Sequence, residues 1–297
     1  MPAPGTSGKM PVSKKTVTGY TCSPTTMAAN TTAVTVSYSE GGVTKTTTTP
    51  VTVTSISNTL ASNSWATIRA VSDAGKGSNY WSVGDAKGIT INGKVGATTI
   101  SNLAISVFIL GFNHNASREG SNRIHFQIGK INGTLVGLVD GNYSNYTSTT
   151  GAFTMNTSYT NSGGWNNSHM RKTVLGSNSA SATSPTANTL LAALPADLRA
   201  VMKPATKYSD NTGGGSDTAS YVTSTTDLLP LLSEFEYHGA RSYANSAEKN
   251  YQAQYDYYRA GNSKVHYRHN ATGTAAGAWC RSVNSGYYYL FCLVTTD

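Results

Sequence analysis

The stretch Ala278-Trp279-Cys280-Arg281-Ser282-Val283-Asn284-Ser285-Gly286-Tyr287-Tyr288-Tyr289-Leu290-Phe291-Cys292-Leu293-Val294 decides the interpretation of this chain. Two hydrophobic segments, 279–282 and 291–294, enclose a run of small residues and three consecutive tyrosines. Tyrosine rings supply large, rigid, amphipathic contact area, while Ser, Gly and Asn supply adaptable hydrogen bonds. The pattern therefore predicts a binding loop displayed between two buried segments.

The composition of the whole chain favours a sheet-rich fold with many loops. The chain has 297 residues, of which 12% are charged and 38% hydrophobic, and this length suffices for a large core. Thr, Val and Tyr are abundant, and these residues suit strands better than helices. Apolar runs recur along the chain and long charge blocks are absent, which excludes a disordered body.

Charge and targeting signals limit the partners and the location. The net charge is +8, but the basic residues are scattered and form no basic helix or aromatic RNA-binding signature, so no nucleic-acid partner is predicted. No apolar run reaches membrane-spanning length, and residues 1–8 lack the basic-then-apolar order of a signal peptide. These features favour a protein made in the cytoplasm, released by lysis and drawn weakly towards an acidic cell surface.

The three cysteines indicate buried thiols rather than a disulfide framework. Cys280 and Cys292 lie where they could pair across a hairpin, and Cys22 is left over. The odd total and the absence of metal-type spacing favour two core thiols that flank the loop.

Residues 16–58 predict a short all-β module after a flexible arm at residues 1–15. Alternating residues at 34–38 and 43–48 lie on either side of a Glu40-Gly41-Gly42 turn, which is a hairpin signal, and 51–53 continues the pattern. The module resembles the later half of a bacterial immunoglobulin-like domain. It is too short for a complete sandwich, so we expect it to dock onto a partner chain.

Residues 59–297 predict strands and helices in one larger domain. Ser64 is placed to cap a helix at 65–71, and a helix at 165–175 is expected to stop at Gly176. The strongest helical stripe covers 189–203, where Pro195 allows a break after Leu194 or a start near it. Strands are expected at 88–95, 105–112, 123–131 and 133–139, the last two as a hairpin.

The nearest approach to a catalytic array is Glu234, Glu236 and His238. On a strand these alternate residues share a face, and paired carboxylates can act as acid and base. A polar network under the tyrosine-rich segment, or pairing with Arg241 and Arg281, explains them more simply. Histidine spacing indicates no zinc site, and phosphate or dinucleotide motifs are absent. We predict no catalytic residues, no metal and no cofactor.

Four segments together resemble an uncharacterised domain of gut-bacterial prophages. They are Trp165 with Met170-Arg171, Leu194-Pro195-Ala196-Asp197-Leu198-Arg199, Leu231-Leu232-Ser233-Glu234, and the ending Trp279-Cys280-Arg281-Ser282…Phe291-Cys292. Members of that family end in Trp-x-Arg-Ser and Phe-Cys-x-Val, and the resemblance covers roughly residues 60–297. The ending is also similar to the variable proteins of diversity-generating retroelements, which have a C-type-lectin-like fold.

This resemblance implies an α+β fold. The expected fold is a C-type-lectin-like domain of mixed or antiparallel β-sheet with two main helices over 59–297, preceded by the short immunoglobulin-like segment. It also implies a site. Trp279, Arg281, Ser282 and Phe291 match the buried frame, whereas the ligand-binding positions would be Tyr267, Arg268, His269, Asn284, Ser285, Tyr287, Tyr288 and Tyr289. The metal-binding cysteines of the related formylglycine-generating enzymes have no counterpart in Cys280 and Cys292.

The implied function is that of a phage virion surface protein of the receptor-binding, fibre or decoration type. It would bind a bacterial surface receptor, protein or glycan, through the tyrosine loop, and other virion proteins through the short module. A homo-oligomer such as a trimer is expected, as for many phage fibres. The alternatives are a bacterial cell-surface adhesin of the same fold, a purely structural capsid or tail decoration protein and, last, a glycan-cleaving enzyme.

Overall fold

The computed structural model of the chain divides into two compact units, residues 1–56 and residues 57–297. The structure describes residues 19–25, 27, 31–51, 53, 55–140, 149, 151–214, 216–287 and 291–294. The division lies close to the boundary predicted between residues 58 and 59. The predicted flexible arm, residues 1–15, lies outside the described residues.

The first unit is a small antiparallel sheet of β1 (Tyr20–Ser23), β2 (Ala33–Glu40) and β3 (Val43–Pro50), in that order. The predicted hairpin is confirmed, because Glu40 pairs with Val43 and both turn glycines have positive φ, +58° at Gly41 and +79° at Gly42. Two-residue hairpin loops favour this mirror-image turn, which glycine adopts without strain. Among the described residues of this unit, Val34 alone is buried, so the sheet has almost no core of its own.

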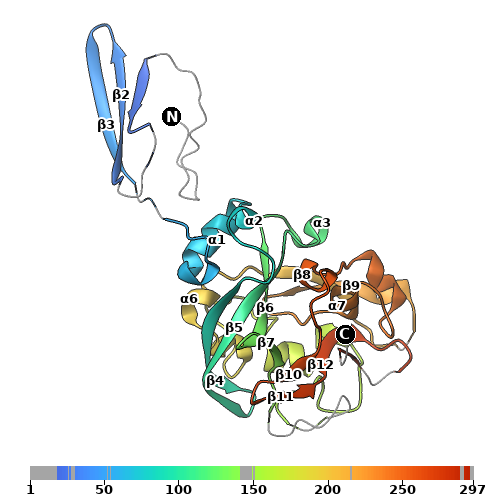
Figure 1. The fold of residues 1–297 in the computed structure, drawn as a ribbon. Coiled ribbons are helices and arrows are strands. Elements are labelled where there is room, and N and C mark those ends of the chain that lie inside the picture. Colours follow the sequence, from blue (N-terminus) through green and yellow to red (C-terminus); the bar gives the residue numbers. More distant parts are fainter. Residues whose placement is uncertain are drawn as a thin grey trace. The chain divides into compact units, whose positions relative to one another are not determined.

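A six-stranded mixed sheet dominates the second unit (Figure 1). Its strands are β4 (Ala86–Val95), β5 (Thr98–Phe112), β6 (Ile124–Ile131), β7 (Thr134–Gly137), β10 (His266–Arg268) and β11 (Ala271–Ala276), in the order β11-β10-β7-β6-β5-β4. Only β7 and β10 pair in parallel. Residues 107–110 of β5 are all buried, so protein covers both faces of this strand. The four predicted strands are confirmed, and so is the hairpin formed by β6 and β7.

The helix α1 (Trp65–Asp73) forms as the sequence predicts. The Ser64 hydroxyl accepts a hydrogen bond from the Thr67 amide at 3.0 Å, which satisfies one of the unpaired donors of the first turn. Trp65, Ile68 and Val71 are buried on one face.

The expected second main helix is interrupted. Two four-residue helices, α5 (Leu190–Ala193) and α6 (Ala196–Arg199), replace it, and Leu194 and Pro195 lie between them. Proline has no amide proton and its ring clashes with the preceding turn, so the break predicted after Leu194 occurs. Residues 165–175 likewise divide into α4 (Gly164–Asn167) and the π-helical η2 (Met170–Val174). Among the described residues, α1 is thus the only helix longer than five residues.

The remaining elements are short and complete a sheet-rich α+β fold with 35% strand and 21% helix. They are η1 (Leu60–Ser62), α2 (Gly77–Tyr80), α3 (Ala116–Glu119), β8 (Ala205–Asp210), η3 (Ala219–Tyr221), β9 (Val222–Asp227), α7 (Glu234–His238), η4 (Ser246–Asn250), α8 (Asp256–Arg259), β12 (Ala278–Val283) and β13 (Phe291–Val294). β8 pairs with β9, and β12 with β13, as separate two-stranded sheets. In the part of the chain that the structure describes, no helix combines the length and apolarity needed to cross a bilayer.

Candidate functional site

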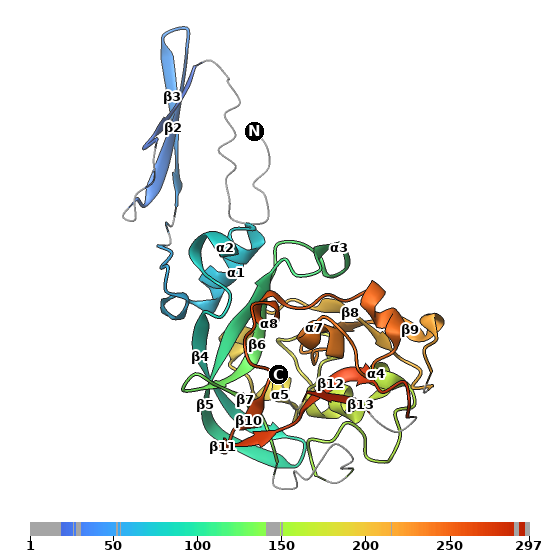
Figure 2. The ribbon, with the colours of Figure 1, turned by 45° about the vertical axis from the view of Figure 1, so that its right-hand side comes forward.

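The C-terminal loop connects the two antiparallel strands β12 and β13. Val283 pairs with Phe291, and residues 284–287 lead out of β12, whereas Tyr288 and Tyr289 lie outside the described residues. β12 contacts both α4 and α7 (Figure 2). Cys280 and Cys292 are free and buried, and burial holds the pKa of both thiols well above the ordinary value. The prediction of two core thiols is confirmed.

Arg281 anchors the hairpin through a buried ion pair. Its guanidinium, which is 0% exposed, forms a bidentate pair with the Glu236 carboxylate, with Nη2 3.0 Å from Oε1. It also donates to the Ser209 hydroxyl at 3.0 Å and to the Leu231 carbonyl at 2.9 Å. Burial alone would raise the pKa of Glu236, but Arg281 and Lys207 outweigh it and hold that pKa well below its ordinary value. The predicted pairing of Arg281 with a carboxylate of this array is confirmed.

Ser282 is fixed by a second buried carboxylate. Its hydroxyl donates to Glu248 at 2.6 Å, and the same carboxylate accepts hydrogen bonds from the Asp210 amide at 2.9 Å and from Gln252 at 3.0 Å. Burial nevertheless raises the pKa of Glu248 to about 7, because few charges offset the lost hydration.

A third carboxylate, Glu234, holds the segment that lies beside the loop. It accepts hydrogen bonds from the backbone amides of Tyr243, at 3.1 and 3.2 Å, and Ala244, at 2.8 Å. The predicted pairing of a carboxylate of this array with Arg241 is wrong, since Arg241 binds Asp217 at 2.7 Å. Glu234, Glu236 and Glu248 together therefore form a buried acidic support under the loop.

The expected strand at Glu234–His238 is wrong, because these residues form the helix α7. Ser233 caps it and forms a reciprocal capping box with Glu236, while Gly239 ends it with φ of +69°. Ser-x-x-Glu followed by a glycine is a helix signature, and this signal was present in the sequence. On a helix, Glu234 and Glu236 do not share a face, which is why they support different parts of the loop.

Three exposed tyrosines lie on segments that are hydrogen-bonded to one another. The Ser285 amide donates to the Tyr243 carbonyl at 2.7 Å, and the Asn161 side chain donates to the Tyr287 carbonyl at 2.8 Å. Tyr159, Tyr243 and Tyr287 are 61%, 57% and 49% exposed, and they are the only exposed large hydrophobic residues of the larger unit within its described part. We call these three residues the tyrosine surface.

The structure corrects three of the predicted burial states around the loop, those of Trp279, Asn284 and Ser285. Asn284, predicted to be exposed, is 7% exposed because it bridges to Ala244 and accepts a hydrogen bond from the Gly286 amide at 2.9 Å. It belongs to the frame of the turn. Trp279, predicted to be buried, is half-buried, as is Ser285. Arg281, Ser282 and Phe291 are buried as predicted.

Tyr267, Arg268 and His269 lie on or directly after β10, in the six-stranded sheet. All three are half-buried. Tyr267 and Arg268 pair with β7, and the His269 ring accepts a hydrogen bond from the Val139 amide at 3.1 Å. The hydrogen bonds of residues 284–287 described above lead instead to residues 161 and 243. Ligand contact by residues 267–269 stays a prediction.

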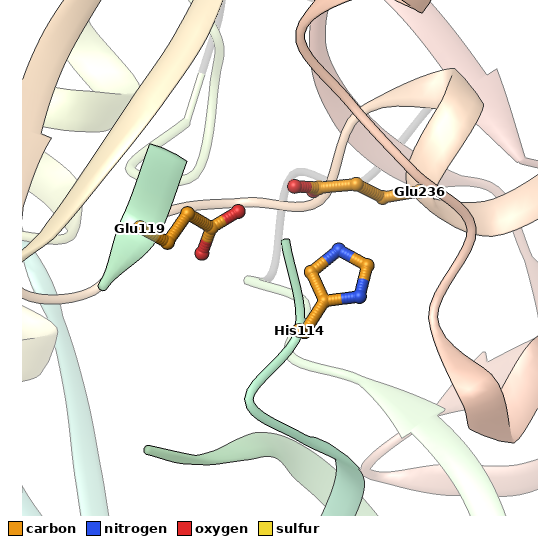
Figure 3. Close-up of side chains that lie close together, drawn as sticks. All are labelled: His114, Glu119 and Glu236. Atoms are coloured by element: carbon orange, nitrogen blue, oxygen red, sulfur yellow. The ribbon is translucent and has the colours of Figure 1, made fainter. Parts of the chain in front are cut away.

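The structure also contains a buried cluster of side chains that the sequence did not predict, and Glu236 belongs to it. Side chains of His114, Glu119 and Glu236 point towards one another (Figure 3), with potential ligand atoms within 4.8 Å. However, the Lys207 ammonium already binds both carboxylates, at 2.7 Å from Glu119 and 3.0 Å from Glu236. With Arg281, the two carboxylates and two cations sum to zero charge. A divalent cation would therefore add uncompensated charge to a buried site. No local pattern signals this cluster, since Lys207 lies 88 residues from Glu119.

No family model matches the chain, and no match is found among curated proteins or among solved structures.

Proposed function

We propose that the larger unit is a recognition domain that binds its ligand through the tyrosine surface and the adjoining C-terminal loop. One observation carries the proposal: Tyr159, Tyr243 and Tyr287 are exposed on three segments that hydrogen bonds join to one another, beside buried carboxylates. An exposed tyrosine is an efficient contact residue. A surface held rigid before binding loses less entropy when a ligand arrives.

The finer assignment rests on the resemblance of the ending to retroelement variable proteins. We propose that the larger unit has a C-type-lectin-like fold and that the chain is a phage virion surface protein which binds a receptor, protein or glycan, on a bacterial cell. The buried Arg281 and Ser282 support this assignment, because the resemblance places them in the frame beneath the ligand-binding residues.

The first unit is proposed to be an immunoglobulin-like module that docks onto other virion proteins. Within its described residues β3 is exposed along its whole length, most of β2 is only half-buried, and Val34 alone is buried. A three-stranded sheet needs an apolar face packed against something to be stable. A partner chain would supply that cover.

Binding of fluorescently labelled protein to a panel of Gram-positive gut bacteria tests the proposal. The variant Tyr243→Ala/Tyr287→Ala should lose at least about 30-fold in affinity for the strains that the wild type binds, since even a single central aromatic contact contributes about 2 kcal/mol or more. The variant Tyr20→Ala, which removes a tyrosine of similar exposure from the other unit, should bind normally. Unchanged binding by the double variant, with its melting temperature preserved, would refute the proposal.

The genes that flank this one distinguish a virion protein from a bacterial adhesin. Capsid and tail genes, or a reverse transcriptase with a template repeat, would support the virion assignment. A cell-wall anchoring or export operon would overturn it while leaving the recognition surface intact.

A further inference from the structure

An apolar pocket of about 200 Å³ lies in the larger unit, between α1, the sheet, α6 and residues 228–232. Aliphatic and aromatic side chains form most of its wall, among them Ile68, Leu110, Phe126, Leu198 and Leu229. An apolar cavity of about 150 Å³ is enough to hold benzene. This pocket therefore has room for a somewhat larger apolar group, but not for a lipid with two long chains.

Four cations also line the pocket, and within the described residues one of them lacks a partner. Lys207 pairs with Glu119 and Glu236. Arg69 and Lys203 both pair with Asp73. The Arg123 guanidinium forms no ion pair and no hydrogen bond within the described part of the chain, although it is half-buried. Burial lowers the pKa of Arg123, the carboxylate of Glu119 raises it, and the nearby charge of Arg69 lowers it again.

This arrangement leaves the donors of Arg123 to water or to a ligand in the pocket. A partly desolvated guanidinium needs acceptors for its fixed fork of donors, and the like charge of Arg69 adds repulsion. A carboxylate matches that fork with two parallel hydrogen bonds. The apolar wall beside it matches a hydrocarbon chain or ring.

We propose that this pocket binds a small monocarboxylic acid, with its carboxylate on Arg123 and its hydrocarbon part against the apolar wall. The site shares no residue with the tyrosine surface. It is thus independent of the proposed receptor binding, and would let the protein bind an organic acid in addition to a cell surface.

Isothermal titration calorimetry with butanoate, hexanoate and octanoate, and with hexan-1-ol, tests the proposal on the full chain. Affinity should rise about fourfold for each added methylene until the cavity is full, because each buried methylene contributes a constant increment. Hexan-1-ol should bind at least about 10-fold more weakly than hexanoate, since it lacks the charged pair.

Two variants separate the charged and apolar halves of the site. Arg123→Gln should weaken hexanoate by about 10- to 100-fold without lowering the melting temperature, because it breaks no pair. Leu198→Trp should block the pocket and abolish binding. Lys94→Gln, an exposed strand position with the same loss of charge, should bind like the wild type. No binding at millimolar acid, equal affinity for hexanoate and hexan-1-ol, or unchanged affinity in Arg123→Gln would each overturn the proposal.

Discussion

Replacing Arg281 with methionine tests whether the buried ion pair supports the C-terminal hairpin. Methionine retains an unbranched apolar stem but removes the guanidinium. The variant loses the bidentate pair with Glu236 and the hydrogen bonds to Ser209 and Leu231. Lys207 then remains as the only cation between Glu119 and Glu236, so one negative charge is left uncompensated in the interior.

The structure sets the expected size of this effect. Removal of one partner from a buried pair costs about 3–5 kcal/mol, because the other charge stays buried. The full stability of a domain is about 5–15 kcal/mol. In the wild type, the depressed pKa of Glu236 contributes stability above the unfolded value near 4.5 that is lost as pH falls. Without Arg281 that pKa rises, so the stability difference between variant and wild type should shrink towards pH 5.

Urea unfolding at pH 7.5 and pH 5 measures this difference. The double variant Arg281→Met/Glu236→Gln should recover much of the loss, because it removes both charges and glutamine can still complete the capping box. The control Arg259→Met breaks an exposed pair with Asp256, in which the arginine side chain is 67% exposed, and should cost less than about 1 kcal/mol. A loss below 1 kcal/mol in Arg281→Met, or a double variant no more stable than the single one, would refute the reasoning.

Two further predictions concern the other buried acids. The pKa of Glu248 near 7 means that the folded protein binds this proton more tightly than the unfolded chain does. Stability should therefore fall by about 3 kcal/mol as pH rises from 4.5 to 7. In urea unfolding of the Glu248→Gln variant, the part of the pH dependence that Glu248 causes should be absent. If the stabilities of variant and wild type changed with pH in parallel, the prediction would be contradicted. The histidines with depressed pKa values, such as His114, act in the opposite direction, so the variant must be compared with the wild type at each pH. Because Lys207 binds the two carboxylates of the His114 cluster, EDTA should leave the melting temperature unchanged; a fall of more than about 4 °C would point to a bound metal.

Local signals predicted the elements whose ends are set by a single residue. The Ser64 cap, the Gly41-Gly42 turn and the break at Pro195 each restrict the backbone directly, so the sequence suffices. The prediction of a strand at 234–238 was wrong because it relied on alternation over five residues and neglected the Ser233-x-x-Glu236 capping box. Short alternating patterns are weaker evidence than a capping signature with a terminal glycine.

The buried charge cluster was not predictable, for a different reason. Glu119, Lys207 and Arg281 meet only after β8, α3 and β12 have packed, and no short-range pattern encodes which charges pair. Asn284 shows the same limit on a smaller scale, since its burial depends on the bridge to Ala244 across the fold. The sequence could therefore identify Arg281, the loop and the pairing with Glu236, but not Glu119, Lys207 and Glu248.

The hydrogen bonds that hold the tyrosine surface determine which side chains its positions can accept. The hydrogen bonds that hold Tyr243 and Tyr287 in place reach their main-chain atoms: Glu234 and Ser285 bind the backbone of Tyr243, and Asn161 binds the carbonyl of Tyr287. Every residue type carries the same main-chain donors and acceptors, apart from the missing amide of proline. The frame thus constrains the backbone at these positions through atoms that do not depend on the tyrosine side chain. Side-chain chemistry at such positions can change while the supporting contacts persist, as a recognition surface that is diversified over a constant scaffold requires.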